Sequence, residues 1–303
     1  MDYFIIILAT ISFAAQFAFT KLYEKSVRQT MITSLVMLVV TSVIGTFLYL
    51  FIGAFSVKFS YISVFWAVVF ALVMIPYYMI GIKVLTLGSL AIYSMFMMLG
   101  GMLVPFFYGI FFLSEGVTPG KLAGTVLLTL FIVLQAVWQK PPAEEGRDVS
   151  AKDKVLFFIL CLLIFILNGL TGVIAKAHQI SEGAVDEVSF TVISCAITAV
   201  LSAALLPLGF IRNRRSAVKE VGSTLRPRPM WVMSLIGAAT YTGNFLHLKA
   251  ASTVPASVQF PLVSGGVIVL SAILSAVAFK ERLSRREWIS VGGAFAATVL
   301  FAF

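Results

Sequence analysis

The sequence predicts an all-α integral membrane protein with ten transmembrane helices, arranged as two inverted five-helix repeats with both termini on the outer side. Composition is the first reason: of 303 residues, 60% are hydrophobic and 12% are charged. Soluble domains carry about a quarter charged residues, so this composition excludes a soluble globular protein and a disordered chain. The second reason is that the charges are segregated. The third is that the two halves of the chain resemble one another.

Ten stretches of 16 to 25 residues contain none of the 22 Lys and Arg or 13 Asp and Glu side chains. An α-helix rises about 1.5 Å per residue, so about twenty residues cross a hydrocarbon core about 30 Å thick. A charge inside that core costs several kcal/mol, which explains the segregation. The first stretch follows an acid and no basic residue, which favours a spanning helix over a cleaved signal peptide. The predicted spans are 3–20, 32–52, 61–82, 89–113, 122–138, 155–175, 188–211, 229–246, 255–279 and 288–303.

Basic residues between the spans predict the orientation. The connections after spans 1, 3, 5, 7 and 9 hold 18 of them, and the other four connections hold 4. Basic connections stay in the cytoplasm, so both termini face outward. The net charge of +9 is therefore a signal of sidedness and does not require nucleic acid. The six basic residues of 212–228 are the strongest such segment, and contact with anionic lipid is the alternative interpretation for them.

An internal repeat divides the chain into residues 1–138, a cytoplasmic linker 139–154, and residues 155–303. SLAIYSMFMMLGG at 89–101 aligns with VPASVQFPLVSGG at 254–266, and Glu115 aligns with Glu281. At another offset, Lys21 aligns with Lys176. Because five helices is an odd number, the second half enters the membrane from the opposite side. Inverted repeats of this kind are typical of secondary transporters.

The two five-helix repeats and the segment HLKAASTVPASVQFPLVSGGVIVLSAILSAVAFKERLSRREWISVGG at 247–293 resemble the EamA-type ten-helix carriers of the drug/metabolite transporter superfamily. In that family each repeat ends with an acid, a polar turn and a glycine-containing last helix, which Glu281, Arg282 and Gly292-Gly293 match well. The resemblance covers the whole chain and implies a carrier, without indicating the substrate. The four-helix pumps of the superfamily carry a Glu inside the first helix, but 3–20 has no acid. This difference argues against proton antiport through such a carboxylate.

Polar and aromatic residues inside the spans are the candidate substrate site, because carrier sites are mostly apolar with a few orienting polar groups. Helix–helix hydrogen bonding is the alternative for Gln16 and Asn168, and helix packing is the alternative for the tyrosines. His247 is a group that titrates near neutral pH in a pathway position, whereas His178 is expected in a solvated loop. The candidates are Gln16, Tyr78, Tyr93, Asn168, Tyr241, Asn244, His247 and Gln259.

Charges at the ends of the spans are the second group of candidates. Glu115 and Glu281 are expected at opposite sides of the membrane as gating or structural groups, each near a Lys or Arg. Lys83 and Lys249 precede the paired fourth and ninth spans. Snorkelling of the lysines to the interface is the alternative. The glycine pairs 100–101 and 265–266 are expected to permit close helix approach.

These observations predict a multi-pass protein of the inner (plasma) membrane that moves a small organic metabolite or drug by alternating access, with its site near the midplane between the repeats. It is expected to be no enzyme and to use no metal or cofactor; H⁺ or another ion is left open as the coupling ion, and monomer or homodimer as the assembly. Cys161 and Cys195 lie in apolar runs and are expected to be buried. The sequence contains no GxxxxGK[ST] motif, which excludes ATP-driven transport by this chain alone. The alternatives are a non-transporting receptor or a channel-like protein, and then a membrane-embedded transferase.

Overall fold

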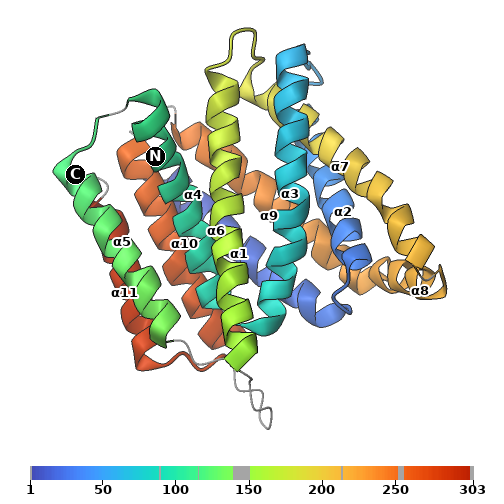
Figure 1. The fold of residues 1–303 in the computed structure, drawn as a ribbon. Coiled ribbons are helices and arrows are strands. Elements are labelled where there is room, and N and C mark those ends of the chain that lie inside the picture. Colours follow the sequence, from blue (N-terminus) through green and yellow to red (C-terminus); the bar gives the residue numbers. More distant parts are fainter. Residues whose placement is uncertain are drawn as a thin grey trace.

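The computed structural model is a bundle of long helices (Figure 1) and describes residues 2–88, 90–114, 116–138, 151–212, 214–251 and 256–300. Eleven helices and no strand lie in these residues. Ten helices coincide with the predicted spans, and α8 falls inside the basic segment 212–228. The helices are α1 (Asp2–Ser26), α2 (Met31–Ile52), α3 (Tyr61–Leu87), α4 (Leu90–Leu113), α5 (Pro119–Trp138), α6 (Ala151–Gln179), α7 (Glu187–Arg212), α8 (Arg214–Thr224), α9 (Pro227–Ala251), α10 (Ala256–Ala278) and α11 (Arg285–Leu300).

Six of these helices are long and apolar enough to cross a membrane: α1 to α4, α6 and α7. Parts of α5 and α10 are shorter apolar segments. Large apolar side chains cover the outside of the bundle, among them Tyr61 and Phe51, which are 96% and 77% exposed. A surface of this kind needs an apolar surrounding, and helices suit it because they satisfy their backbone groups internally. An all-α membrane-embedded fold follows.

Local capping groups explain where several helices begin. The Thr30 side chain accepts from the Thr33 amide while the Thr33 side chain accepts from the Thr30 amide, which is a capping box at the start of α2. The Asp186 carboxylate accepts from the Ser189 amide at 3.0 Å and starts α7. Ser284 and Glu287 exchange side-chain and backbone hydrogen bonds at the start of α11.

Helices of the two halves of the chain pack mainly against each other. α1 packs against α9 and α10, α2 against α7 and α9, α3 against α6 and α7, and α4 against α6 and α10. α5 packs against α11 at one edge of the bundle, where Figure 1 shows them side by side. The core therefore lies between the halves, and neither half forms a separate globule.

The bundle has two ends, which we name after a buried residue at each. The Lys21 end, at the bottom of Figure 1, gathers the α1–α2, α3–α4 and α10–α11 connections, and Glu281 there accepts from the Leu90 amide at 3.2 Å. The His178 end gathers the α2–α3 and α6–α7 connections, where the Lys58 amide donates to Ser189 at 3.1 Å. Because the ten long helices alternate in direction, α1 begins and α11 ends toward the His178 end.

Glycine pairs bring α4 and α10 close to their neighbours, as predicted. A Cβ on Gly100 would clash with the backbone of Phe165, and one on Gly101 would lie 2.6 Å from the Asn168 side chain. A Cβ on Gly266 would lie 2.7 Å from the Thr10 side chain. Gly101 thus permits the α4–α6 approach, and Gly266 permits the α10–α1 approach.

Candidate functional site

Aromatic side chains from α1, α3 and α4 belong to one buried core cluster, which also includes residues of the second half. Tyr77 and Tyr78 of α3 pack edge to face with ring centres 5.4 Å apart. Tyr93 of α4 packs edge to face on Phe17 of α1 at 5.8 Å. Tyr241 of α9 lies in a separate buried cluster, where it packs edge to face on Tyr49 with ring centres 6.2 Å apart. The structure thus places two of the predicted tyrosines, Tyr78 and Tyr93, in one buried core cluster and Tyr241 in another.

Met97 of α4 links this cluster to α6. Its sulfur accepts from the Tyr77 hydroxyl at 2.9 Å, and its carbonyl accepts from the Asn168 side chain at 2.7 Å. Asn168 therefore joins two helices, which is the alternative that the sequence left open for it. Gln16 of α1 is also buried, with 6% of its surface exposed.

Asn244 of α9 is exposed although it lies on the packing face of its helix. Ile236, Gly237 and Tyr241 are buried at helical spacing. Asn244 follows Gly237 by seven residues and Tyr241 by three, so it belongs to the same stripe. A side chain there should be covered by neighbouring helices, yet it is exposed. Asn244 is therefore an exposed position on a side of α9 that is otherwise buried.

His247 lies one turn beyond Asn244 and is half-buried. Its ring packs edge to face on Phe13 of α1, with centres 6.3 Å apart. A Cβ on Gly243 would lie 3.1 Å from the Phe13 ring, so α1 and α9 approach closely here. His247 therefore lies along the contact of α9 with α1, in the half of α9 nearer the His178 end.

Lys21 is the most extensively bonded charge at its end of the bundle. Its ammonium group donates to the Leu85 carbonyl at 2.6 Å and to the Gly88 carbonyl at 3.3 Å. It also lies 3.5 Å from a Glu281 carboxylate oxygen and 3.9 Å from Glu24. Only 8% of the Lys21 side chain is exposed.

Glu281 completes this polar cluster. Its other carboxylate oxygen accepts from the Leu90 amide and from the Ser275 hydroxyl. One carboxylate thus contacts α1, the first turn of α4 and the end of α10. Glu281 thus lies just after the end of α10 and beside the buried Lys21.

Sequence reasoning missed Lys21 as a site residue and selected Lys83 instead. Lys83 is exposed on α3, as is Lys249 on α9. The signal for Lys21 was present, because it directly follows the first apolar stretch and aligns with Lys176. Glu115 lies outside the described residues, and so does the side chain of Gln259, whose backbone belongs to α10.

The expectation that His178 is solvated is wrong. His178 lies in the last turn of α6, is 1% exposed and stacks on Phe190 at 3.8 Å between ring centres. Its Nε2 lies 2.9 Å from the Ser63 hydroxyl. Because α6 continues past the last apolar residue, the imidazole is carried into the α3–α7 contact.

Asp186 stabilises the α6–α7 connection at the same end. Its hydrogen bonds from the amide of Ser189 hold the pKa of the Asp186 carboxyl below its usual value. Lys58 lies 3.9 Å away, but both side chains are well exposed, so this ion pair contributes little.

Cys161 and Cys195 are buried and unpaired with each other, as predicted. Within the residues that the structure describes, no group of three or more His, Cys, Asp or Glu side chains is placed to hold a metal ion.

Comparisons with known proteins identify the fold alone. No family model matches the chain, and no curated protein matches it. Solved structures do match: one, described only as "Crystal structure of protein", has a TM-score of 0.57 and 17% sequence identity. The match covers 99% of this chain and 95% of that chain. The two proteins therefore share a fold over nearly their whole lengths.

Proposed function

We propose that this chain is a secondary active transporter for a small organic metabolite or drug. All ten long helices cross the inner membrane as two inverted five-helix repeats, 1–138 and 155–303, and the site lies between the repeats. The Lys21 end faces the cytoplasm, in keeping with the distribution of basic residues. Alternating access moves the substrate past the tyrosine cluster.

The packing pattern is the observation that carries this proposal. If the repeats are related by symmetry, α1, α2, α3, α4 and α5 correspond in that order to α6, α7, α9, α10 and α11. Each helix in a contact can then be replaced by its counterpart. The α1–α9 contact then becomes α6–α3, α4–α6 becomes α10–α1, and α3–α7 becomes α9–α2, and each is an observed contact. The α2–α7, α4–α10 and α5–α11 contacts map onto themselves. A pattern that survives this exchange is what two repeats related by a two-fold axis produce.

The two ends of the bundle differ in a way that fits an outward-facing state. Lys21 is buried in its polar cluster, whereas its repeat counterpart Lys176 is exposed. Phe17 and Tyr93 pack together one turn from that cluster and add an apolar layer. Asn244 is exposed toward the other end. A buried charge cluster at one end and an exposed polar position toward the other is what we expect of an outward-facing carrier.

The cluster also limits the class of substrate. Its rings and the Met97 sulfur suit a planar or apolar molecule, or a cation held against a ring face. Asn244 and His247 add a few orienting polar groups. A receptor, a channel or a transferase is the alternative function. A channel would need a continuous polar path, but the Lys21 cluster and the Phe17–Tyr93 pair block one end.

A two-step experiment tests the proposal. A thermal-shift screen of metabolites on purified protein identifies a ligand, which raises the melting temperature by binding the folded state. Uptake of that ligand is then measured in proteoliposomes with and without unlabelled ligand inside. A carrier gives saturable uptake stimulated by counterflow. Flux that never saturates would indicate a channel, and binding without flux would indicate a receptor.

A further inference from the structure

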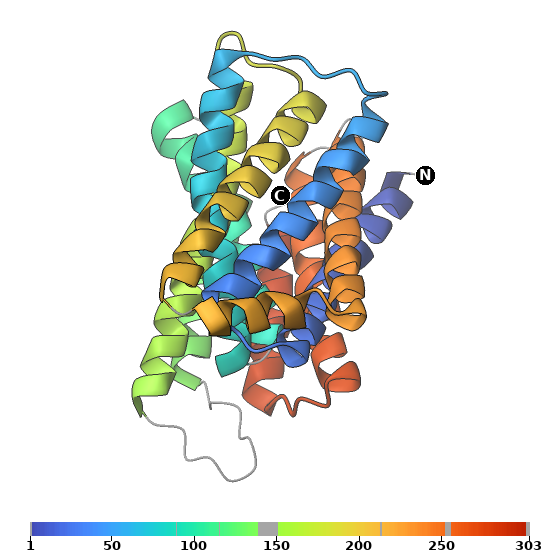
Figure 2. The same cartoon turned by 90° about the vertical axis from the view of Figure 1, so that its right-hand side faces the viewer.

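The helix α8 was not expected from the sequence and lies apart from the proposed transport pathway. It runs across the Lys21 end of the bundle, transverse to α2 and α7 (Figure 2). Its inward face is well fixed, because Ala217 and Thr224 are fully buried. Glu220 accepts from Thr30 at 2.8 Å and from Ser216 at 2.9 Å. The only acid of α8 is therefore engaged on the protein side.

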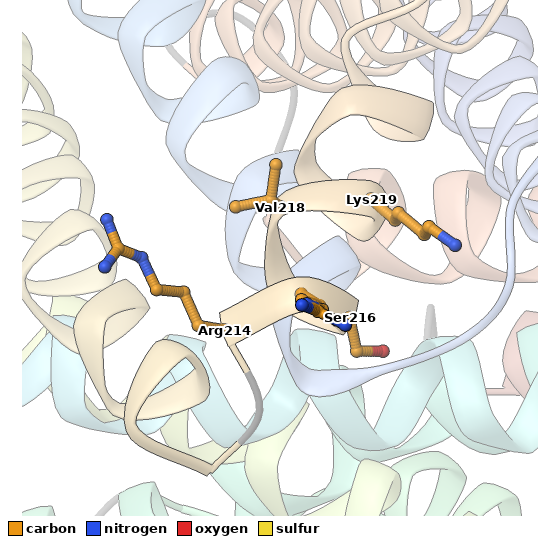
Figure 3. A pocket seen from close by; sticks show the side chains of 5 residues that line it. Arg214, Ser216, Val218 and Lys219 are labelled. Atoms are coloured by element: carbon orange, nitrogen blue, oxygen red, sulfur yellow. The ribbon is translucent and has the colours of Figure 1, made fainter.

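The opposite face of α8 is basic and exposed. Arg214, Arg215 and Lys219 are exposed, and Figure 3 shows the Arg214 and Lys219 side chains extending to opposite sides of Val218. These residues and Ser216 line a shallow hollow of about 630 Å³. Val218 is 56% exposed in its middle. The basic side chains of Arg214, Arg215 and Lys219 thus line the same hollow as the apolar side chain of Val218.

Exposed apolar side chains precede and follow α8 in the sequence. Ile211 at the end of α7 is 81% exposed, Leu225 after α8 is 50% exposed, and Trp231 in α9 is 70% exposed. A helix with charged and apolar groups on one face, beside an exposed Trp, suits the boundary between headgroups and acyl chains. If only water surrounded this face, the unfavourable hydration of these apolar side chains would not be relieved.

We propose that this outer face of α8, formed by Arg214, Arg215, Val218 and Lys219, is a docking surface for anionic phospholipid headgroups. The guanidinium groups and the ammonium group bind lipid phosphates, and Val218, Leu225 and Trp231 contact the adjoining acyl chains. The helix lies in the plane of the membrane because its inward face is fixed to the α1–α2 connection. This inference depends on the part of the proposed function that places the protein in a membrane. It does not depend on whether the protein transports a substrate.

Lipid dependence of the full-length protein tests this surface. The protein is placed in nanodiscs of phosphatidylcholine alone or with 30% phosphatidylglycerol, and melting temperature and retained lipid are measured. Phosphatidylglycerol is expected to raise the melting temperature and to be retained preferentially, and both effects should weaken at high salt. Because both leaflets have the same composition, any role of the basic residues in orienting the protein does not affect the melting temperature or the retained lipid.

A triple variant and a matched control locate the effect. R214Q/R215Q/K219Q should lose most of the phosphatidylglycerol preference, at about fivefold in affinity for each basic residue. R282Q/R285Q/R286Q removes the same charge at the same end of the bundle and should keep the preference. Equal losses in the two variants would overturn the proposal, as would a wild-type protein indifferent to phosphatidylglycerol.

Two further measurements cover the remaining outcomes. Glycerol phosphate in solution distinguishes a membrane surface from a simple anion site; if it reproduces the full stabilisation, the docking proposal is wrong. If the triple variant does not fold, a fluorophore on V218C in a C161A/C195A background replaces it. Its quenching by spin-labelled phosphatidylglycerol should exceed quenching by spin-labelled phosphatidylcholine, and equal quenching would refute the proposal.

Discussion

Lys21 shows how a single charge closes one end of the bundle. A buried ammonium group needs compensation, and here two carbonyls and two carboxylates provide it. These partners belong to α1, to the end of α3 and to the segment before α11. Removing the charge therefore affects three parts of the chain together.

We predict that K21Q destabilises the protein by about 1–3 kcal/mol, because it leaves Glu281 poorly compensated. The free energy of unfolding in detergent checks this, with the exposed Lys83 as the control site for K83Q. The double variant K21Q/E281Q should recover part of the loss, since no unpaired charge remains. Additive effects of the two substitutions would show that the pair is not coupled.

Asp186 gives a prediction about pH at the other end. Its folded-state pKa is lowered, so its contribution is fully present above the unfolded value of about 3.9. That contribution is lost as the pH falls through the lower folded-state value. D186A should cost about 1 kcal/mol at pH 7 and should make this part of the acid dependence disappear. Stability curves of D186A and wild type that stay parallel down to pH 3 would contradict this.

Residue roles were only partly predictable from the sequence. The tyrosines and Glu281 could be selected as candidates because polar groups are few in the apolar spans and at their ends. Lys21 and His178 both lie just beyond an apolar stretch, which marks them as residues at the end of a span but does not show whether they are buried. Whether such a residue is solvated or buried depends on how far the helix continues and on which neighbour covers it, as Phe190 covers His178.

Helix identity followed closely from the sequence, because the cost of burying charge separates spans from connections. The exception is α8, where six basic residues indicated a loop. Its inward positions Ala217 and Thr224 are seven residues apart and lie on one face, but eleven residues are too few to make that pattern distinctive. Contacts with α2 and α7 explain why the segment is helical.

Close approach of α4 and α6 depends on glycine. We predict that G100A lowers the melting temperature by several degrees, because a Cβ there meets the Phe165 backbone, which cannot rotate away. G292A is the matched control, since a Cβ on this helical glycine has nothing within 4 Å. It should be neutral or stabilising, because Ala favours the helix. Equal melting temperatures for the two variants would show that the approach is not tight.

At the scale of the molecule, the internal repeat is predicted from the sequence, and the exchange of helix contacts is the observation on which we base the proposal of two repeats. The repeat does not specify which conformation the chain adopts. That depends on differences between the repeats, such as a buried Lys21 against an exposed Lys176. The central claim is that the two ends of the bundle open alternately.

Thiol accessibility from each side of the membrane tests this claim most directly. N244C and Y93C are made separately in a C161A/C195A background and treated with a membrane-impermeant thiol reagent in right-side-out and inside-out vesicles. The exposed Lys58 provides a control, K58C, that should react from outside in every background.

We predict that N244C reacts from the outside while Y93C does not react. Adding K21Q/E281Q should protect N244C and make Y93C reactive from the cytoplasmic side. Simultaneous reactivity of N244C and Y93C in one background, or no response to K21Q/E281Q, would contradict alternating access.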